Sequence, residues 1–433
     1  MNYNSLILIK KIFLFLNIIF SLKINCKLSF PIYINKTRLS LARTPNTIMY
    51  SLYLNEIYSN FSIGTPPQQI PITFKLQEYP FYILGPSTEK YNLIYFNDNL
   101  SQTYFSYKND SLIWYNLDFD YGYTSYDLIH FNNINNNKNF SFILAEEKSY
   151  ERIFLMSGCI GLALDDEGKD YITNVNFIKQ LKKNNLIDNF GFMLKFNNNN
   201  KKHSEFIFNL NLSDYYGIHS NVVKYYNRWS IKFDEIIFQN KSISFDLVGG
   251  FYYTLGVIIY KSKKNFEIFF KDFIKNNICF ESSFTEEINK YYFYYCNENF
   301  DIKKFNNITF YKHALNTDFV LTGEDLFIKI KNYYYFLIIF NFESLYDWKL
   351  GIPFLKKYNF AFDYEKKMIY LINNNNNNNN SNSKESNFYY YIIIFILIII
   401  IICLLYLIKL KYFNHNKKIR AKELISNYSL IEN

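Results

Sequence analysis

The chain has few of the residues and motifs from which common catalytic centres are built. Its five histidines lie far apart and form no HExxH motif or other i, i+4 pair, which argues against a zinc site. The GxSxG sequence of a nucleophile elbow is absent, which excludes a hydrolase of that kind. The Gly249-Gly250 pair lacks the strand and helix that flank a phosphate-binding loop. We therefore expect neither a metal nor a cofactor.

Glycine, proline and alanine are also scarce, whereas asparagine, lysine, isoleucine, tyrosine and phenylalanine dominate the composition. These five residue types share A/T-rich codons, so much of the skew reflects the coding sequence. The formal net charge is +9, but the lysines are scattered singly and in pairs among acidic residues. Binding to nucleic acid phosphates needs clustered positive charge, so we expect no nucleic acid partner. A length of 433 residues suffices for two lobes with a large core.

Two apolar segments indicate membrane targeting. Residues 1–26 contain two lysines followed by the run IFLFLNIIFSL, which is typical of a secretory signal peptide. Residues 388–408 are uncharged and would form a helix about 30 Å long, which matches the thickness of a bilayer core. Basic residues follow this span, so residues 409–433 are expected to form a cytosolic tail. The sequence thus predicts a type I protein of the secretory pathway or plasma membrane, with a lumenal or extracellular ectodomain.

The five cysteines divide according to these segments. Cys26 belongs to the signal peptide and Cys403 to the membrane span. Cys279 and Cys296 remain as a pair in a compartment that permits oxidation, so we expect them to form a disulfide. Cys159 is then expected to be a buried thiol.

Asn-X-Ser/Thr sequons occur at many positions before the span. They begin at Asn35, Asn60, Asn99, Asn109, Asn139, Asn211, Asn240 and Asn307. A further sequon, at Asn427, falls in the expected cytosolic tail and shows how readily the pattern arises in an Asn-rich chain. The sequons alone therefore add little to the assignment of compartment.

The chain divides into a lead, a globular part and a stalk. Residues 27–55 are expected to form a short irregular lead or pro-like segment. Residues 56–371 show short alternating or apolar runs typical of β-strands, with helical spacing only at 175–187 and 263–277. Residues 372–387 are low in complexity and rich in asparagine, which predicts a flexible stalk. A mostly-β ectodomain on a stalk follows.

Five blocks in the globular part carry a family resemblance. They are IGTPPQ at Ile63–Gln68, SLIWYNLDFDYGYTSYDLI with Tyr115, Gly122 and Asp127, SGCIGLAL at Ser157–Leu164, RWSIKFDEIIF at Arg228–Phe238, and LGIPFLKKYNFAFDYEKKMIYL at Leu350–Leu371. In this order they resemble the pepsin-like aspartic proteases, in particular the membrane-anchored plasmepsin-type members. The resemblance implies an all-β, bilobal fold with lobes at 56–215 and 216–371, followed by the C-terminal transmembrane helix.

The same resemblance locates the positions of the catalytic acids. In this family two aspartates share one proton and activate a water, because two like charges so close cannot both ionise. The ungapped match places the first acid at Lys75, with Gln77 in place of the loop glycine, and the best second register places the other acid at Val248. Neither residue supplies a carboxylate. Glu78 and Asp246 are the shifted residues that could replace the lost acids.

Three functions are therefore compatible with the sequence. The first is a catalytically inactive pseudoenzyme that binds peptide or protein in the cleft between the lobes, with Tyr82, Tyr115 and Phe251 as aromatic anchors. The second is an active aspartic endopeptidase that uses the shifted carboxylates of Glu78 and Asp246. The third is a structural or adhesion ectodomain whose cleft is filled by its own side chains.

Overall fold

The computed structural model describes residues 27–372, apart from 35–36, 55–56, 79, 92–93, 114–120, 132–137, 148–155, 165–174, 198–203, 221–227, 254, 287, 316 and 345–346, together with Lys409 and Ile419. The expected signal peptide, the Asn tract, the span at 388–408 and nearly all of the tail lie outside the described residues. No helix among the described residues is long and apolar enough to cross a membrane.

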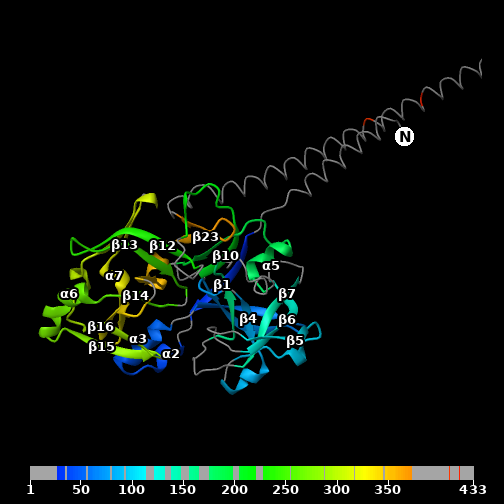
Figure 1. The fold of residues 1–433 in the computed structure, drawn as a ribbon, viewed down its shortest axis with the longest axis horizontal. Helices are drawn as coiled ribbons and strands as arrows, with labels where there is room; N and C mark the ends of the chain where they lie inside the picture. Colours follow the sequence, from blue (N-terminus) through cyan, green and yellow to red (C-terminus); the bar gives the residue numbers. More distant parts are fainter. Residues whose placement is uncertain are drawn as a thin grey trace, which may run out of the picture. The chain divides into compact units, whose positions relative to one another are not determined.

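The described residues form two large sheets and few helices, as expected for an all-β, bilobal fold (Figure 1). The first sheet has 13 strands in the order β11-β24-β23-β9-β10-β1-β2-β3-β8-β4-β7-β6-β5. Its strands are β1 (Leu28–Ile34), β2 (Ile57–Ile63), β3 (Gln68–Lys75), β4 (Phe81–Leu84), β5 (Phe105–Ile113), β6 (Tyr121–His130), β7 (Lys138–Glu147), β8 (Gly158–Gly161), β9 (Gly191–Lys195), β10 (Ser204–Leu210), β11 (Gly217–His219), β23 (Phe360–Asp363) and β24 (Met368–Leu371). The last two strands come from the end of the globular part, so the sheet joins both halves of the chain.

The second sheet has 11 strands, ten of them in the order β18-β17-β12-β13-β22-β14-β21-β16-β20-β19, with β15 paired to β16. They are β12 (Ser230–Phe238), β13 (Lys241–Phe251), β14 (Ile258–Tyr260), β15 (Cys279–Glu286), β16 (Asn289–Asn297), β17 (Ile308–Lys312), β18 (Thr317–Leu321), β19 (Phe327–Ile330), β20 (Tyr333–Phe336), β21 (Ile338–Phe340) and β22 (Trp348–Leu350). The sheet lies within the second half of the chain and forms the second lobe.

The strands follow the hydrophobic pattern of the sequence. In β2 the buried side chains alternate with more exposed ones, as period-2 spacing requires of a strand with one core face. In β4 the uninterrupted run FYIL is buried throughout, because this strand lies inside the sheet between β8 and β7. Aromatic side chains fill much of the core. Phe74 and Phe206, for example, stack with ring centroids 4.1 Å apart.

Both expected helices are present. The stretch at 175–187 contains α5 (Phe177–Lys183), whose first turn is capped by the side chain of Asn176. The stretch at 263–277 contains α6 (Lys264–Lys275), which buries three phenylalanines on one face. Two short helices, α7 (Gly323–Leu326) and α8 (Ile352–Lys357), lie between strands of the second half.

The lead was expected to be irregular, but the structure shows ordered elements in it. Besides β1 it contains α2 (Thr37–Leu41) and α3 (Pro45–Tyr53). The start of α3 is fixed by a capping box in which Thr44 and Thr47 each accept a hydrogen bond from the backbone N–H of the other. Proline at the first helical position also favours this start.

The buried face of α3 packs on the second lobe, in a cluster that includes Ile48, Met49, Leu52, Tyr53, Leu255, Val257 and Ile259. The backbone N–H of Gly256 donates to the carbonyl oxygen of Tyr53, 3.3 Å away. The lead thus contributes one strand to the first sheet and one helix to the core of the second lobe.

The expected disulfide is present, between Cys279 and Cys296. The two residues lie directly opposite each other in the β15–β16 hairpin, so the bond ties the open end of that hairpin. Cys159 in β8 is buried, as expected.

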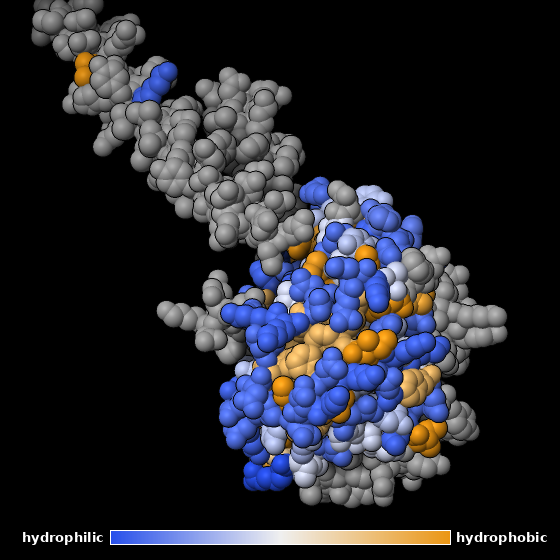
Figure 2. All heavy atoms as spheres, turned by 90° about the vertical axis from the view of Figure 1, so that its left-hand side faces the viewer, coloured by the Kyte–Doolittle hydropathy of each residue, from blue (hydrophilic) through white to orange (hydrophobic). Residues whose placement is uncertain are grey.

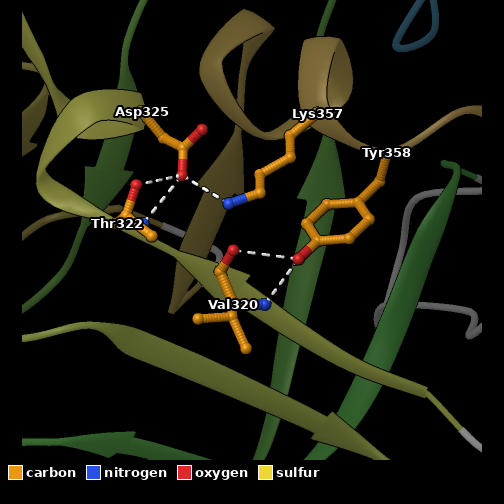
Figure 3. Close-up of polar contacts among 5 residues, drawn as sticks. All are labelled: Val320, Thr322, Asp325, Lys357 and Tyr358. Carbon is orange, nitrogen blue, oxygen red and sulfur yellow. Dashed lines mark hydrogen bonds and ion pairs between the residues drawn. The ribbon is translucent and has the colours of Figure 1, made fainter.

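The outer strand β18 is capped by a tyrosine (Figure 3). The Tyr358 hydroxyl accepts a hydrogen bond from the backbone N–H of Val320 and donates one to its carbonyl oxygen, 2.9 Å away. Beside it, Asp325 caps α7 by accepting from Thr322 and also binds Lys357. Because the tyrosine satisfies both backbone groups of Val320, this part of the edge cannot pair with another strand.

Candidate functional site

In the first lobe, the loop after β3 is braced by β8. This strand pairs in parallel with β3, placing Lys75 opposite Gly161, and antiparallel with β4, placing Phe81 opposite Ile160. The backbone N–H of Leu162 then donates to the carbonyl oxygen of Lys75 at 2.8 Å. The position expected for the first acid is therefore held rigidly at the end of a central strand.

The second lobe repeats this arrangement with β13, β22 and β14. Strand β22 pairs in parallel with β13, placing Phe251 opposite Leu350, and antiparallel with β14, placing Ile259 opposite Lys349. Gly351 follows Leu350 as Gly161 follows Ile160 in the first lobe. The two bracing strands thus occupy equivalent places between their neighbours.

The registers of the two lobes identify the second position. In the first lobe Ile160 pairs with Phe74, and Lys75 is the next residue. In the second lobe Leu350 pairs with Phe251, and Tyr252 is the next residue. Tyr252 is therefore the counterpart of Lys75. This corrects the sequence-based placement at Val248, which lies four residues earlier, within β13 and opposite Lys232 of β12.

The shifted candidate Asp246 lies still earlier in the same strand. Phe251 lies five positions farther along β13, which at about 3.3 Å per residue amounts to about 17 Å. Phe251 in turn is within hydrogen-bond reach of the first loop, through Gln77. The structure therefore does not bring the backbone at Asp246 to the first position.

Lys75 and Glu78 form an ion pair at the end of β3. The Nζ atom of Lys75 donates to Oε1 of Glu78 at 2.9 Å, and the two side chains are 13% and 19% exposed. This contact joins an ammonium group to the carboxylate that the sequence offered as a shifted acid. The arrangement balances charge and differs from a pair of acids that share one proton.

Gln77 crosses from the first lobe to the second. It stands where the family's loop glycine is expected, and its side-chain amide donates to the backbone carbonyl oxygen of Phe251. Its Oε1 atom is buried and has no hydrogen-bond partner among the described residues. A glycine has no side chain and could not make this contact.

Two of the three expected aromatic anchors are buried in the core. Tyr82 is 2% exposed and packs in a cluster with Ile143 and Cys159. Phe251 is fully buried, with its ring centroid 4.9 Å from that of Phe360. Neither side chain is available to line an accessible groove, because both are packed in the core. Tyr115 lies outside the described residues.

Asp127 in β6 is buried and binds the loop that precedes β5. Its Oδ1 atom accepts from the Thr103 hydroxyl at 2.5 Å and from the backbone N–H of Leu128 at 2.7 Å. Gly64 in the IGTPPQ turn has φ of +85°, and a Cβ there would meet Ser101 Oγ at 2.7 Å. The motif glycine is thus required by the backbone and by close packing.

A second lysine, which sequence reasoning missed, lies beside Tyr252. The Nζ atom of Lys349 is 5.6 Å from the centroid of the Tyr252 ring. Burial, together with a smaller repulsion from Arg228, lowers the pKa of Lys349 to about 8 against an opposing attraction from Glu286.

A search of curated proteins found no match to this chain. A family model described as eukaryotic aspartyl protease matches residues 56–373. The match includes both bracing strands, the IGTPPQ turn and the final hairpin of β23 and β24. With the repeated arrangement of strands in the two lobes, it shows that the chain belongs to the eukaryotic aspartyl protease family.

Proposed function

We propose that this ectodomain is a non-proteolytic member of its family in which the centre of the interlobe cleft is filled. It serves as a structural or adhesion module on the membrane. The observation that carries this proposal is the side chain of Gln77, which reaches the Phe251 carbonyl across the lobes beside the Lys75–Glu78 ion pair.

Three features of the centre support inactivity. The first position holds an ammonium group, which at acidic or neutral pH is protonated and cannot act as a general base. Its counterpart, Tyr252, carries a phenol, which is a far weaker acid than a carboxylic acid. Glu78 is held by Lys75, and Asp246 lies about 17 Å along the strand from Phe251. These four residues therefore do not place a pair of acids around a single water.

Burial of Tyr82 and Phe251 favours a filled cleft over a peptide-binding groove. Hot-spot aromatics of an interface must be exposed before binding, and these two are already packed in the core. The proposed location is a secretory-pathway or plasma membrane, with the expected type I span at residues 388–408 as the anchor.

The test is an assay of proteolysis by the purified ectodomain on a denatured protein, from acidic to neutral pH. Each reaction is run with and without a transition-state-mimic inhibitor of aspartic proteases. We expect no inhibitor-sensitive cleavage at any pH. Cleavage that the inhibitor blocks, and that Glu78→Gln abolishes, would establish the alternative of an active endopeptidase with a shifted acid.

A binding measurement separates a filled cleft from a groove. The same inhibitor and a library of extended peptides are added to the ectodomain, and the melting temperature is recorded. We expect no shift, because ligand binding raises the melting temperature only if the cleft can accept the ligand. A saturable rise that Gln77→Ala enhances would support groove binding instead.

A further inference from the structure

The asparagines of the sequons differ in exposure from the other asparagines. All six sequon asparagines whose side chains are described are exposed: Asn60, Asn99, Asn139, Asn211, Asn240 and Asn307. Asparagines outside sequons include four buried ones, Asn176, Asn209, Asn341 and Asn359. An abundance of asparagine explains how many sequons there are, but it does not explain why their side chains avoid the interior.

Three of the six exposed asparagines lie in a turn or directly beside the end of a strand, whereas Asn60 lies within β2 with its side chain exposed. Asn240 has φ of +58° in the two-residue turn between β12 and β13, at the tip of that hairpin. Asn211 directly follows β10, and Asn307 directly precedes β17. At such places a large substituent on the side chain extends into solvent and disturbs no packing. Hydrophilic residues cover much of the face shown in Figure 2, which suits such substituents.

We propose that these six exposed asparagines are sites of N-linked glycosylation. The co-substrate is an oligosaccharide joined to a lipid diphosphate, as used in a secretory compartment. A bond forms between Nδ2 of the asparagine and C1 of the first sugar, and the bond from C1 to the diphosphate oxygen breaks. Nδ2 loses one proton, and the lipid diphosphate departs with the electron pair. The serine or threonine two residues later completes each acceptor.

The chain contains a matched pair that tests the role of exposure. Asn209 and Asn211 are two residues apart, but Asn209 is 6% exposed and has φ of +66°. Its Oδ1 atom accepts from the backbone N–H groups of Asp188 and Asn189, each at 2.9 Å. A glycan on Asn209 would break these contacts and displace its surroundings, whereas a glycan on Asn211 meets solvent.

The experiment uses the full chain, translated in the presence of microsomes and mapped by mass spectrometry of its peptides. We expect glycans at the six exposed asparagines and none at Asn427 in the tail. Ser213→Ala should remove the glycan at Asn211 alone and leave resistance to proteolysis unchanged. A map in which most of the six asparagines are unmodified would overturn the proposal.

The matched variant Asn211→Thr removes the sequon at Asn211 and creates one at Asn209. We expect the variant either to lack a glycan at Asn209 or, where it carries one, to lose its resistance to proteolysis. Both results agree with a requirement for exposure. A chain that carries a glycan at Asn209 and resists proteolysis as well as the Ser213→Ala chain would contradict it.

Discussion

Replacing Lys349 by methionine should stabilise the ectodomain at neutral pH. Burial lowers the pKa of this lysine from its usual 10.5 to about 8, so the folded state disfavours its charge. A shift of this size corresponds to about 3 kcal/mol, and solvent screening of a half-buried group reduces it to about 1–2 kcal/mol. Methionine has a similar length and needs no hydration. Lys349→Met should therefore raise the free energy of unfolding by about 1–2 kcal/mol at pH 7.

The pH dependence gives the sharper test. Because the pKa of Lys349 is lower in the folded state, the unfolded state binds more protons between about pH 8 and pH 10.5. The stability of the unmodified protein should rise with pH through this window. The advantage of Lys349→Met should be largest below pH 8 and should disappear above about pH 10.5, where the lysine is neutral in both states.

Urea unfolding of residues 27–372 at a series of pH values measures this difference. Lys241→Met serves as the control, because Lys241 is exposed at the start of β13. The control should change stability by less than about 0.5 kcal/mol at every pH. A Lys349→Met protein that is less stable than the unmodified one at pH 7, or an advantage that does not vary with pH, would refute the reasoning.

Three further predictions can be checked by the same urea unfolding. Tyr358→Phe leaves both backbone groups of Val320 without their partner and should cost about 1–3 kcal/mol. Burial raises the pKa of Tyr358 to about 12, so the contribution of this tyrosine to the free energy of unfolding should be lost as pH rises from about 10 through 12. Replacing Cys279 and Cys296 together by alanine should cost about 3 kcal/mol, and an unchanged midpoint would argue against the disulfide in solution. Gln77→Gly removes the interlobe hydrogen bond and should cost about 1–2 kcal/mol, and an unchanged stability would contradict the contact.

The fold was predictable because the family blocks are short, ordered and spaced by elements of fixed length. The ungapped match placed the first acid at Lys75, and the structure shows this residue at the end of β3, opposite Gly161 of β8. The second position was missed because Gly249-Gly250 imitates a loop glycine. In the structure both glycines lie within β13, where a Cβ at Gly249 would meet the Phe233 ring at 2.8 Å. The Gly249-Gly250 pair therefore indicates close packing of side chains against the strand and does not mark a turn.

Other features of the site depend on tertiary contacts that sequence patterns do not encode. Tyr82 is buried, but a tyrosine exposed in a groove would be the same residue type and could occupy the same place in the alternating pattern of a strand. The sequence pattern therefore does not distinguish the two. The interlobe contact of Gln77 joins segments 174 residues apart. By contrast, helix α3 did leave a sequence signal. Thr44, Pro45 and Thr47 form a start signature that could have been recognised in the lead.

The position of β1 has a consequence for maturation. Leu28–Ile32 of this strand pair with β10, and Tyr33 and Ile34 pair with β2, so β1 is an interior strand. Cleavage of the chain between the lead and β2 would therefore produce a nicked molecule of two associated polypeptides. Dissociation of the shorter piece would leave the edges of β2 and β10 unpaired and expose the apolar side chains on which α3 packs. The cleaved lead would therefore stay bound as a noncovalent subunit.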